Sequence, residues 1–208
     1  MTRRFVSKLA RYATVLCVSL TLAGCSLIPW TGREPVTHYI LTDPGPLVFG
    51  AYTHRGVLLL REMDVPAFYQ VPRLAYSSEA GTRSHYEYAR WSEPIGQRLT
   101  WLLRQRVEAA KVFDNVASLG SGVLGDYQLN TRLVDFFHES ATPPGVVLLI
   151  LEVELIRRDS AQLIGHRLFV SQIPVARHDA AAAADAMGVA ANQVVDELIL
   201  WLEQAAGN

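Results

Sequence analysis

Cys25 is the residue of this sequence best placed for chemistry, because it closes the stretch Leu22-Ala23-Gly24-Cys25. The residues before position 12 include no acidic side chain and several basic ones, Arg3, Arg4, Lys8 and Arg11. Residues 12–21 are mostly apolar. A basic start, ~7–15 apolar residues and small residues at the cut are typical of a secretory signal. The apolar segment is too short to cross a bilayer, which needs ~20 residues.

The residues around this thiol resemble a bacterial lipobox, in which the Cys is acylated and the chain is cut just before it. We therefore expect residues 1–24 to be a lipoprotein signal peptide. Cys25 would then carry covalent diacylglycerol and an N-acyl chain such as palmitate. Each buried methylene adds ~0.8 kcal/mol, so several chains together form a stable membrane anchor. The alternative is an ordinary secretory peptide in which the Cys occurs by chance.

The residues after Cys25 predict where and how the chain is held. Ser26 follows the Cys where Asp would stand, which resembles the outer-membrane rather than the inner-membrane destination of Gram-negative lipoproteins. We therefore expect the protein to be lipid-anchored at the periplasmic face of the outer membrane. Residues 25–36 contain Pro29, Gly32 and Pro35 and few core-forming side chains, so they are predicted to be a lipidated tether.

Composition limits the partners and the chemistry of the cleaved chain. Cleavage before Cys25 leaves 184 of 208 residues, which suits a single domain, residues 37–208. It removes four of 19 basic residues, so 15 Lys and Arg remain against 20 Asp and Glu, a net charge of −5. Nucleic-acid binders need a basic face, so we expect no nucleic-acid partner. With Cys17 removed and Cys25 acylated, no thiol remains for a disulfide, a thiolate metal site or a nucleophile.

No other set of residues has the spacing of a catalytic or metal site. The His residues form no i, i+2 or i, i+4 pair: His38, His54, His85, His138, His166 and His178. No Gly-x-Ser-x-Gly elbow is present. Glu152 and Glu154 share one face of a predicted strand, and alternating exposure explains them better than a catalytic carboxylate pair. We therefore expect no enzyme activity, no metal and no cofactor apart from the lipid on Cys25.

Residues 120–125 match Gly-x-Gly-x-x-Gly, the phosphate-binding pattern of dinucleotide sites. Such a site requires the loop to open a helix whose N-terminus faces the pyrophosphate. Residues 126–138 instead alternate between apolar and polar side chains, which predicts a long strand. The loop is therefore interpreted as a flexible turn.

The remaining pattern predicts an α+β fold with a mostly antiparallel or mixed sheet and two long amphipathic helices packed on one of its faces. Residues 73–90 are predicted to form a hairpin, and residues 126–173 an antiparallel meander of three strands. Further strands are predicted over residues 37–42, 56–64 and 112–118.

The first predicted helix opens at Trp91-Ser92-Glu93-Pro94, where Ser92 or Glu93 can cap it, and runs to Ala110. The second is capped by Asp179 and runs to about residue 205.

The apolar stripe of the first helix excludes Trp101 and several charged residues, Arg98, Arg104, Arg106 and Glu108. Trp101 is therefore either covered by another part of the chain or offered to a partner.

The order of several short motifs resembles the ABC-type transport auxiliary lipoproteins, of which paraquat-inducible protein C is the best-known type. The motifs are the lipobox, Tyr39-Ile40-Leu41-Thr42-Asp43-Pro44, Val65-Pro66-Ala67-Phe68-Tyr69-Gln70-Val71-Pro72-Arg73-Leu74 and Arg90-Trp91-Ser92-Glu93-Pro94. The match departs at Tyr69-Gln70, where the family more often has Leu-Asp, and at Ser92, where Ala is usual.

This resemblance implies an auxiliary component of an MCE-type lipid transport system. An inner-membrane ABC transporter and a periplasmic MCE-domain tunnel would move lipid between the membranes, and the lipoprotein would dock the tunnel to the outer membrane. A homo-oligomeric ring is also compatible with it. The alternative function is a periplasmic carrier that holds lipid in its own cavity. Tyr69, Trp91 and Trp101 are the candidates for binding a partner, with internal packing as the alternative for Trp91.

Overall fold

A computed structural model describes residues 34–42 and 56–207, and its contacts divide the chain into two units, Met1–Pro35 and Val36–Asn208. The predicted signal peptide, Cys25 and most of the predicted tether lie outside the described residues. All the elements below belong to the second unit.

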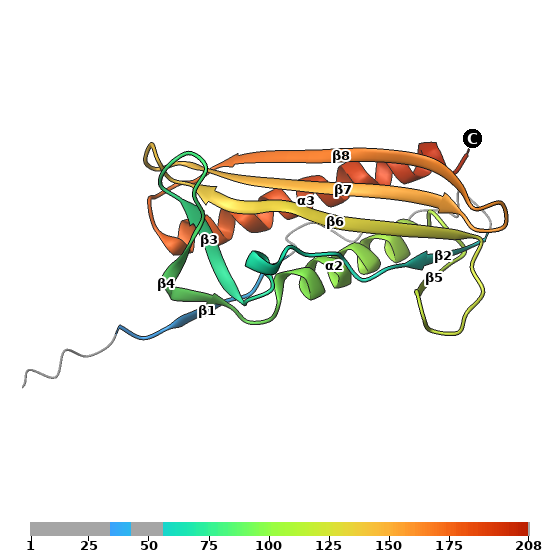
Figure 1. Ribbon diagram of the computed structural model, residues 1–208, viewed down its shortest axis with the longest axis horizontal. Helices are drawn as coiled ribbons and strands as arrows, with labels where there is room; N and C mark the ends of the chain where they lie inside the picture. The colour runs from blue at the N-terminus through green and yellow to red at the C-terminus, as the bar shows by residue number, and fades with distance from the viewer. Residues whose placement is uncertain (1–33, 43–55, 208) are drawn as a thin grey trace, which may run out of the picture. The chain divides into compact units, whose positions relative to one another are not determined.

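In its described residues, the second unit has an α+β fold with an eight-stranded mixed sheet and two long helices (Figure 1). The strands are β1 (Thr37–Tyr39), β2 (Val57–Leu60), β3 (Arg73–Ser77), β4 (Ser84–Trp91), β5 (Asn115–Ser118), β6 (Tyr127–Glu139), β7 (Val146–Arg157) and β8 (Gln162–Pro174). The helices are a 3-10 turn, η2 (Ala67–Tyr69), and two α-helices, α2 (Ile95–Ala110) and α3 (Ala180–Ala205). The predicted fold class is confirmed in its sheet and helix content.

The three long strands form the antiparallel meander that the sequence predicts. β6 pairs with β7 along their full length, and β7 pairs with β8 in the same way. Every second side chain of β7 is buried, namely Val147, Leu149, Leu151, Val153 and Leu155. Glu152 and Glu154 lie on the opposite, partly exposed face, so the pleat of the strand accounts for their shared side.

The rest of the sheet is mixed. β3 and β4 form the predicted antiparallel hairpin. β1 pairs with β4, β2 pairs with β5 and β6, and β3 pairs with β6, all in parallel. β6 is therefore the central strand, with β2 beside its first half and β3 beside its end.

Three of the predicted strands are shorter in the structure. The segment predicted to extend over residues 112–118 forms β5 only from Asn115, yet Val112 and Phe113 are buried. Leu41 and Met63 are likewise buried beyond the ends of β1 and β2. Apolar residues in the connections resemble strand residues in sequence because they also fill the core.

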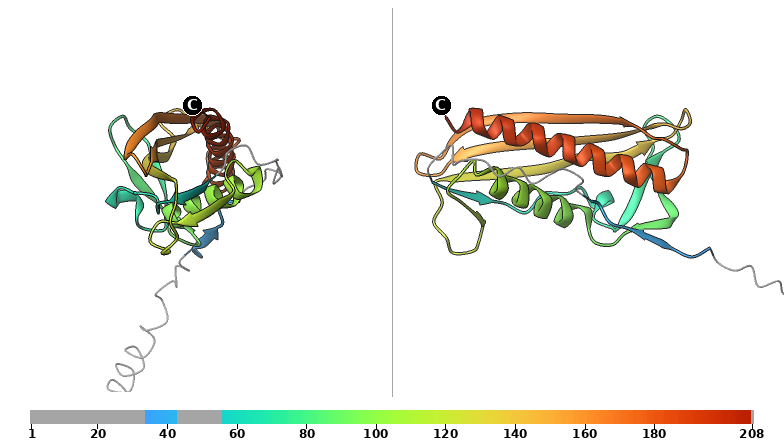
Figure 2. Two further views of the ribbon diagram at one scale, coloured as in Figure 1. Left: turned by 90° about the vertical axis from the view of Figure 1, so that its right-hand side faces the viewer. Right: turned by 180° about the vertical axis from the view of Figure 1, so that it is seen from behind.

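Helix α3 lies along β7 and β8, as Figure 2 shows from behind. Trp201 meets Phe169 of β8 edge to face at 6.0 Å, and the hydroxyl of Ser171 donates to Gln193 at 2.9 Å. Asp179 caps the helix as predicted, because its carboxylate accepts a hydrogen bond from the Ala182 amide at 2.8 Å.

Helix α2 contacts α3 and β5. Arg106 was predicted to lie on the polar side of α2, but it is only 6% exposed. It is buried because α3 covers that side of α2, and Asp196 of α3 forms an ion pair with its guanidinium. The predicted cap of α2 is also corrected: Pro94 is the capping residue, and no side chain caps the helix.

Candidate functional site

Tyr69 and Trp91 lie in the core, which corrects the prediction that their rings face a partner. They are 6% and 4% exposed. Trp91 ends β4, where its backbone amide donates to the Pro72 carbonyl at 3.1 Å and its strand pairs with Tyr39 of β1. Trp91 belongs to the hydrophobic core, in agreement with the alternative of internal packing.

Tyr69 is held in a buried hydrogen-bond network. Its hydroxyl donates to Asp135 of β6, and Arg83 pairs with the same carboxylate at 2.5 Å. Burial raises the pKa of Tyr69 to about 12, and the hydrogen bond to Asp135 acts in the same direction. The Tyr therefore remains neutral and serves to join η2 to the sheet.

Trp101 lies on the surface and lines a depression beside α2. Its ring is 45% exposed, and the Arg98 guanidinium lies over it at 4.4 Å from the ring centroid. It is therefore the most exposed of the three aromatic candidates, all of which the structure describes. Its role in binding a partner stays a prediction.

Residues 61–66, which link β2 to η2, form the wall opposite α2. The Asp64 amide donates to the Thr131 carbonyl of β6 at 2.9 Å, and the Met63 amide donates to the Thr100 hydroxyl of α2 at 3.1 Å. Gly96 permits this close approach, because a Cβ there would collide with Val65. The segment is thus held between the sheet and the helix.

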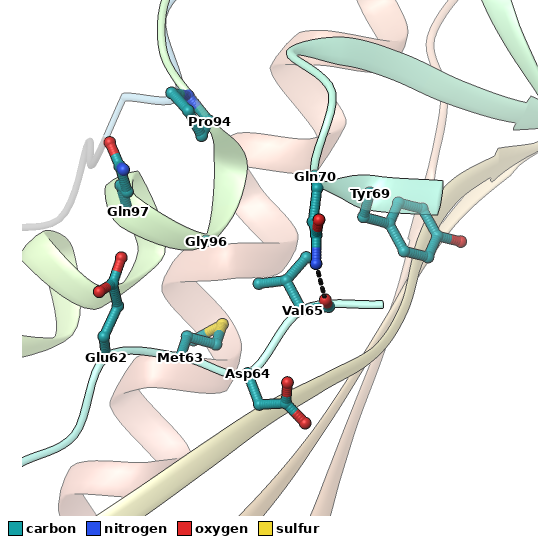
Figure 3. Close-up of a pocket in the computed structure, with 9 residues that line it drawn as sticks. All are labelled: Glu62, Met63, Asp64, Val65, Tyr69, Gln70, Pro94, Gly96 and Gln97. Atoms are coloured by element: carbon teal, nitrogen blue, oxygen red, sulfur yellow. Dashed lines mark hydrogen bonds between the residues drawn. The ribbon is translucent and has the colours of Figure 1, made fainter. Parts of the chain in front are cut away.

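Two adjacent depressions lie between this segment and α2, and we call them together the α2 groove. One has a volume of about 350 Å³ and is lined by Glu62, Met63, Asp64, Val65, Tyr69, Gln70, Pro94, Gly96 and Gln97 (Figure 3). The other has a volume of about 320 Å³ and is lined by Leu60, Glu62, Gln97, Thr100, Trp101, Arg104, Ser118 and Leu119. Because Glu62 and Gln97 line both, the two depressions adjoin at these residues.

Arg104 sets the charge at the β5 end of the α2 groove. Its Nε donates to Glu108 at 2.8 Å, and its Nη1 donates to the Ser118 hydroxyl of β5 at 3.1 Å. Glu62 is exposed at the junction, and no other described residue forms an ion pair or hydrogen bond with it. The sequence pattern around Glu62 gave no signal of a site, because Glu62 follows an apolar strand and only the fold brings it to α2.

A second polar cluster lies inside the fold between the hairpin and the end of β6. His138 is fully buried, and its Nε2 donates to the Pro144 carbonyl at 2.8 Å while Tyr86 donates to its Nδ1 at 2.6 Å. Since a carbonyl can only accept, Nε2 carries a proton, and because burial disfavours a second proton on Nδ1 the ring is neutral and accepts from Tyr86. Burial lowers the pKa of His138 and raises that of Tyr86 to about 12. Both groups are structural.

Acidification is expected to destabilise the protein through His138. Its pKa in the fold lies below its unfolded value of about 6.5, so its contribution is complete above that pH and declines as pH falls below it. The slope is at most about 1.4 kcal/mol per pH unit for one such group. Urea unfolding between pH 7.5 and 5.5 should give a shallower slope for His138→Gln than for the wild type. If the free energy of unfolding depended on pH equally in the His138→Gln variant and the wild type, His138 would not be the source of the acid sensitivity.

The described residues contain neither a metal site nor a membrane-spanning helix. Residues 34–42 and 56–207 include no group of three His, Cys, Asp or Glu side chains that could hold a metal ion. Within the same ranges, each helix is too short or too polar to cross a bilayer. The α2 groove combines an exposed aromatic ring, that of Trp101, with charged side chains, those of Glu62, Asp64 and Arg104.

The described residues thus form an α+β domain with a surface groove beside α2. The sequence matches the family model of the ABC-type transport auxiliary lipoprotein component over residues 39–199. The chain belongs to this family, as its motif order indicated. It is accordingly a lipoprotein component of ABC-type transport, a class that is not one of enzymes.

Solved structures share this fold. A DUF330 protein from Xanthomonas campestris is 22% identical over 83% of this chain and 97% of its own, with a TM-score of 0.75. An uncharacterized protein is 16% identical over 81% of this chain and 99% of its own, with a TM-score of 0.64. A hypothetical protein from Chlamydia trachomatis is 6% identical over 74% and 100%, with a TM-score of 0.53. No curated protein sequence matches the chain.

Proposed function

We propose that this lipoprotein docks a periplasmic MCE-domain tunnel to the outer membrane, as the auxiliary component of an MCE-type ABC lipid transporter. Lipid on Cys25 holds it at the periplasmic face of that membrane, and the tunnel connects it to the inner-membrane ABC transporter. Two observations support the proposal. The chain belongs to a family of ABC-type transport auxiliary lipoproteins. It also has an exposed aromatic side chain, Trp101, beside the α2 groove.

The packing of the domain favours docking over the alternative of a lipid carrier. The apolar space enclosed by α2, α3 and β7, lined by residues such as Leu103, Leu149 and Val194, has a volume of only about 10 Å³. This is the size of a single water-sized probe, so it cannot hold an acyl chain. The two depressions of the α2 groove, which are larger, lie at the surface beside α2.

The family is not an enzyme class, and we propose that the protein itself is not catalytic. Its polar clusters serve packing: Tyr69 and Asp135 join η2 to β6, and His138 and Tyr86 join β6 to β4. A homo-oligomeric ring is compatible with the proposal, because β1, β5 and β8 each have one unpaired edge among the described strands.

Co-purification tests this proposal. The acylated, C-terminally tagged protein, extracted from its own bacterium in mild detergent, should retain an MCE-domain protein and an ABC permease, identified by mass spectrometry. Trp101→Ala should reduce their recovery about tenfold or more, because exposed aromatic anchors dominate the energy of interfaces. Leu200→Ala, at a 58% exposed position on α3, is the matched control and should leave recovery unchanged. Isolation of the wild type alone under all mild conditions would refute the docking function.

A further inference from the structure

We propose that the α2 groove binds an extended segment of the partner protein that carries a basic side chain beside a large apolar one. The inference rests on the proposed function, because it names the chemistry of the partner that the surface around Trp101 receives. The basic side chain pairs with Glu62, and the apolar one packs against Trp101.

The dimensions of the α2 groove fit an extended chain. Its lining residues on α2 run from Pro94 to Arg104, which corresponds to about 15 Å at ~1.5 Å per residue. An extended chain covers that length with about four to five residues at ~3.3 Å each. Side chains two positions apart on such a chain point the same way, so they can enter the two adjoining depressions.

The charge in the α2 groove selects a cation. Glu62 lies where the two depressions meet and is exposed, and no other described residue forms an ion pair with it. The other charged groups of the groove are already paired, since Asp64 lies 3.5 Å from Arg132 and Arg104 lies 2.8 Å from Glu108. The available carboxylate is therefore Glu62, and a Lys or Arg of the partner complements it.

The apolar part of the α2 groove is next to this carboxylate. Trp101 lines the depression toward β5 together with Leu60 and Leu119. Arg98 lies over the Trp101 ring at 4.4 Å from its centroid and is not among the residues that line this depression. A large apolar side chain next to the basic one would bury this surface.

Peptide selection with charge reversal tests the inference. A library of random twelve-residue peptides displayed on phage is panned against the full acylated protein in detergent micelles. Enriched peptides should carry Lys or Arg within two positions of an aromatic or large aliphatic residue. One enriched peptide is then synthesised with a fluorophore, and its Kd is measured by fluorescence anisotropy. Glu62→Arg and Trp101→Ala should each weaken binding about tenfold or more, and Glu62→Arg should prefer the version of the peptide in which Glu replaces the basic residue.

The matched control is Glu87→Arg, which reverses an exposed carboxylate on β4 and should leave the Kd unchanged. All the substituted residues are exposed, so thermal unfolding should be the same for each variant as for the wild type. The inference is overturned if no peptide is enriched, if the enriched peptides lack basic residues, or if Glu62→Arg binds them normally. Displacement of the peptide by glycerophosphoethanolamine would also overturn it, by assigning the groove to a lipid head group. Peptide selection needs no transporter, so failure of co-purification alone would refute only the docking function.

Discussion

Replacement of Cys25 by Ser is expected to abolish lipid attachment and leave the precursor uncleaved or mislocalised. Acylation forms a thioether on the Cys sulfur, which the Ser hydroxyl does not replace, and cleavage of a lipoprotein follows acylation. Anchoring by several acyl chains, each methylene contributing ~0.8 kcal/mol, would be lost as a whole. Labelling with palmitate, followed by fractionation of the membranes, measures both effects.

The sequence offers a matched control for this change. Cys17 lies in the apolar part of the predicted signal, so Cys17→Ser should leave labelling, cleavage and outer-membrane location unchanged. Recovery of labelled, normally cleaved Cys25→Ser protein in the outer membrane would contradict the lipobox assignment. A wild type that takes up no palmitate would contradict it as well.

Local periodicity was sufficient to predict the elements that pack against the core along their whole length. The alternation in β6 and β7 was predicted because each of these two strands has one buried face. β8 completes the predicted meander, although only Phe169 and Ser171 of this strand are buried. The second predicted helix, capped by Asp179, is α3, in which Met187 and Leu198 are fully buried. The side-chain pattern of such elements directly reflects the layer beneath them.

Pairings between distant strands could not be predicted in the same way. The parallel pairs β1–β4, β2–β5 and β2–β6 join segments separated by long connections, and nothing in the sequence of either partner records which strand lies beside it. The sequence therefore predicted a mostly antiparallel or mixed sheet, and only the structure established that it is mixed.

The candidate site residues show the same difference between features that the local sequence pattern reveals and features that depend on contacts between distant segments. Trp101 was singled out because it departs from the apolar stripe of its own helix, and that local signal identified an exposed ring. Tyr69 and Trp91 gave no local signal, since burial by β6 and the hairpin is a tertiary effect. Arg106 departs from the stripe as well, but α3 covers it, so departure from a stripe predicts exposure only where no second helix packs.

Replacement of Gly145 by Ala is expected to destabilise the fold by about 3–5 kcal/mol, a large part of the ~5–15 kcal/mol that stabilises a typical domain. Gly145 has a φ of +89° in the turn before β7. A Cβ there would collide with the Glu139 carbonyl oxygen and would lie 2.5 Å from Nε2 of His138. A backbone carbonyl cannot rotate away as a side chain can, so the end of β6 would have to shift. The His138–Pro144 hydrogen bond would shift with it.

Gly81→Ala is the control that separates two contributions to the effect of Gly145→Ala: the steric collision of the new Cβ and the cost of a positive φ. Gly81 has a similar φ of +77°, but a Cβ there would meet no described atom within 4 Å. It should therefore cost only the ~1–2 kcal/mol of a positive φ. Urea unfolding of both variants in detergent, followed by circular dichroism, gives the comparison at constant m-value. Equal stability of the two variants would mean that the turn before β7 can open, and that the close packing of Gly145 on Glu139 and His138 does not hold the end of β6.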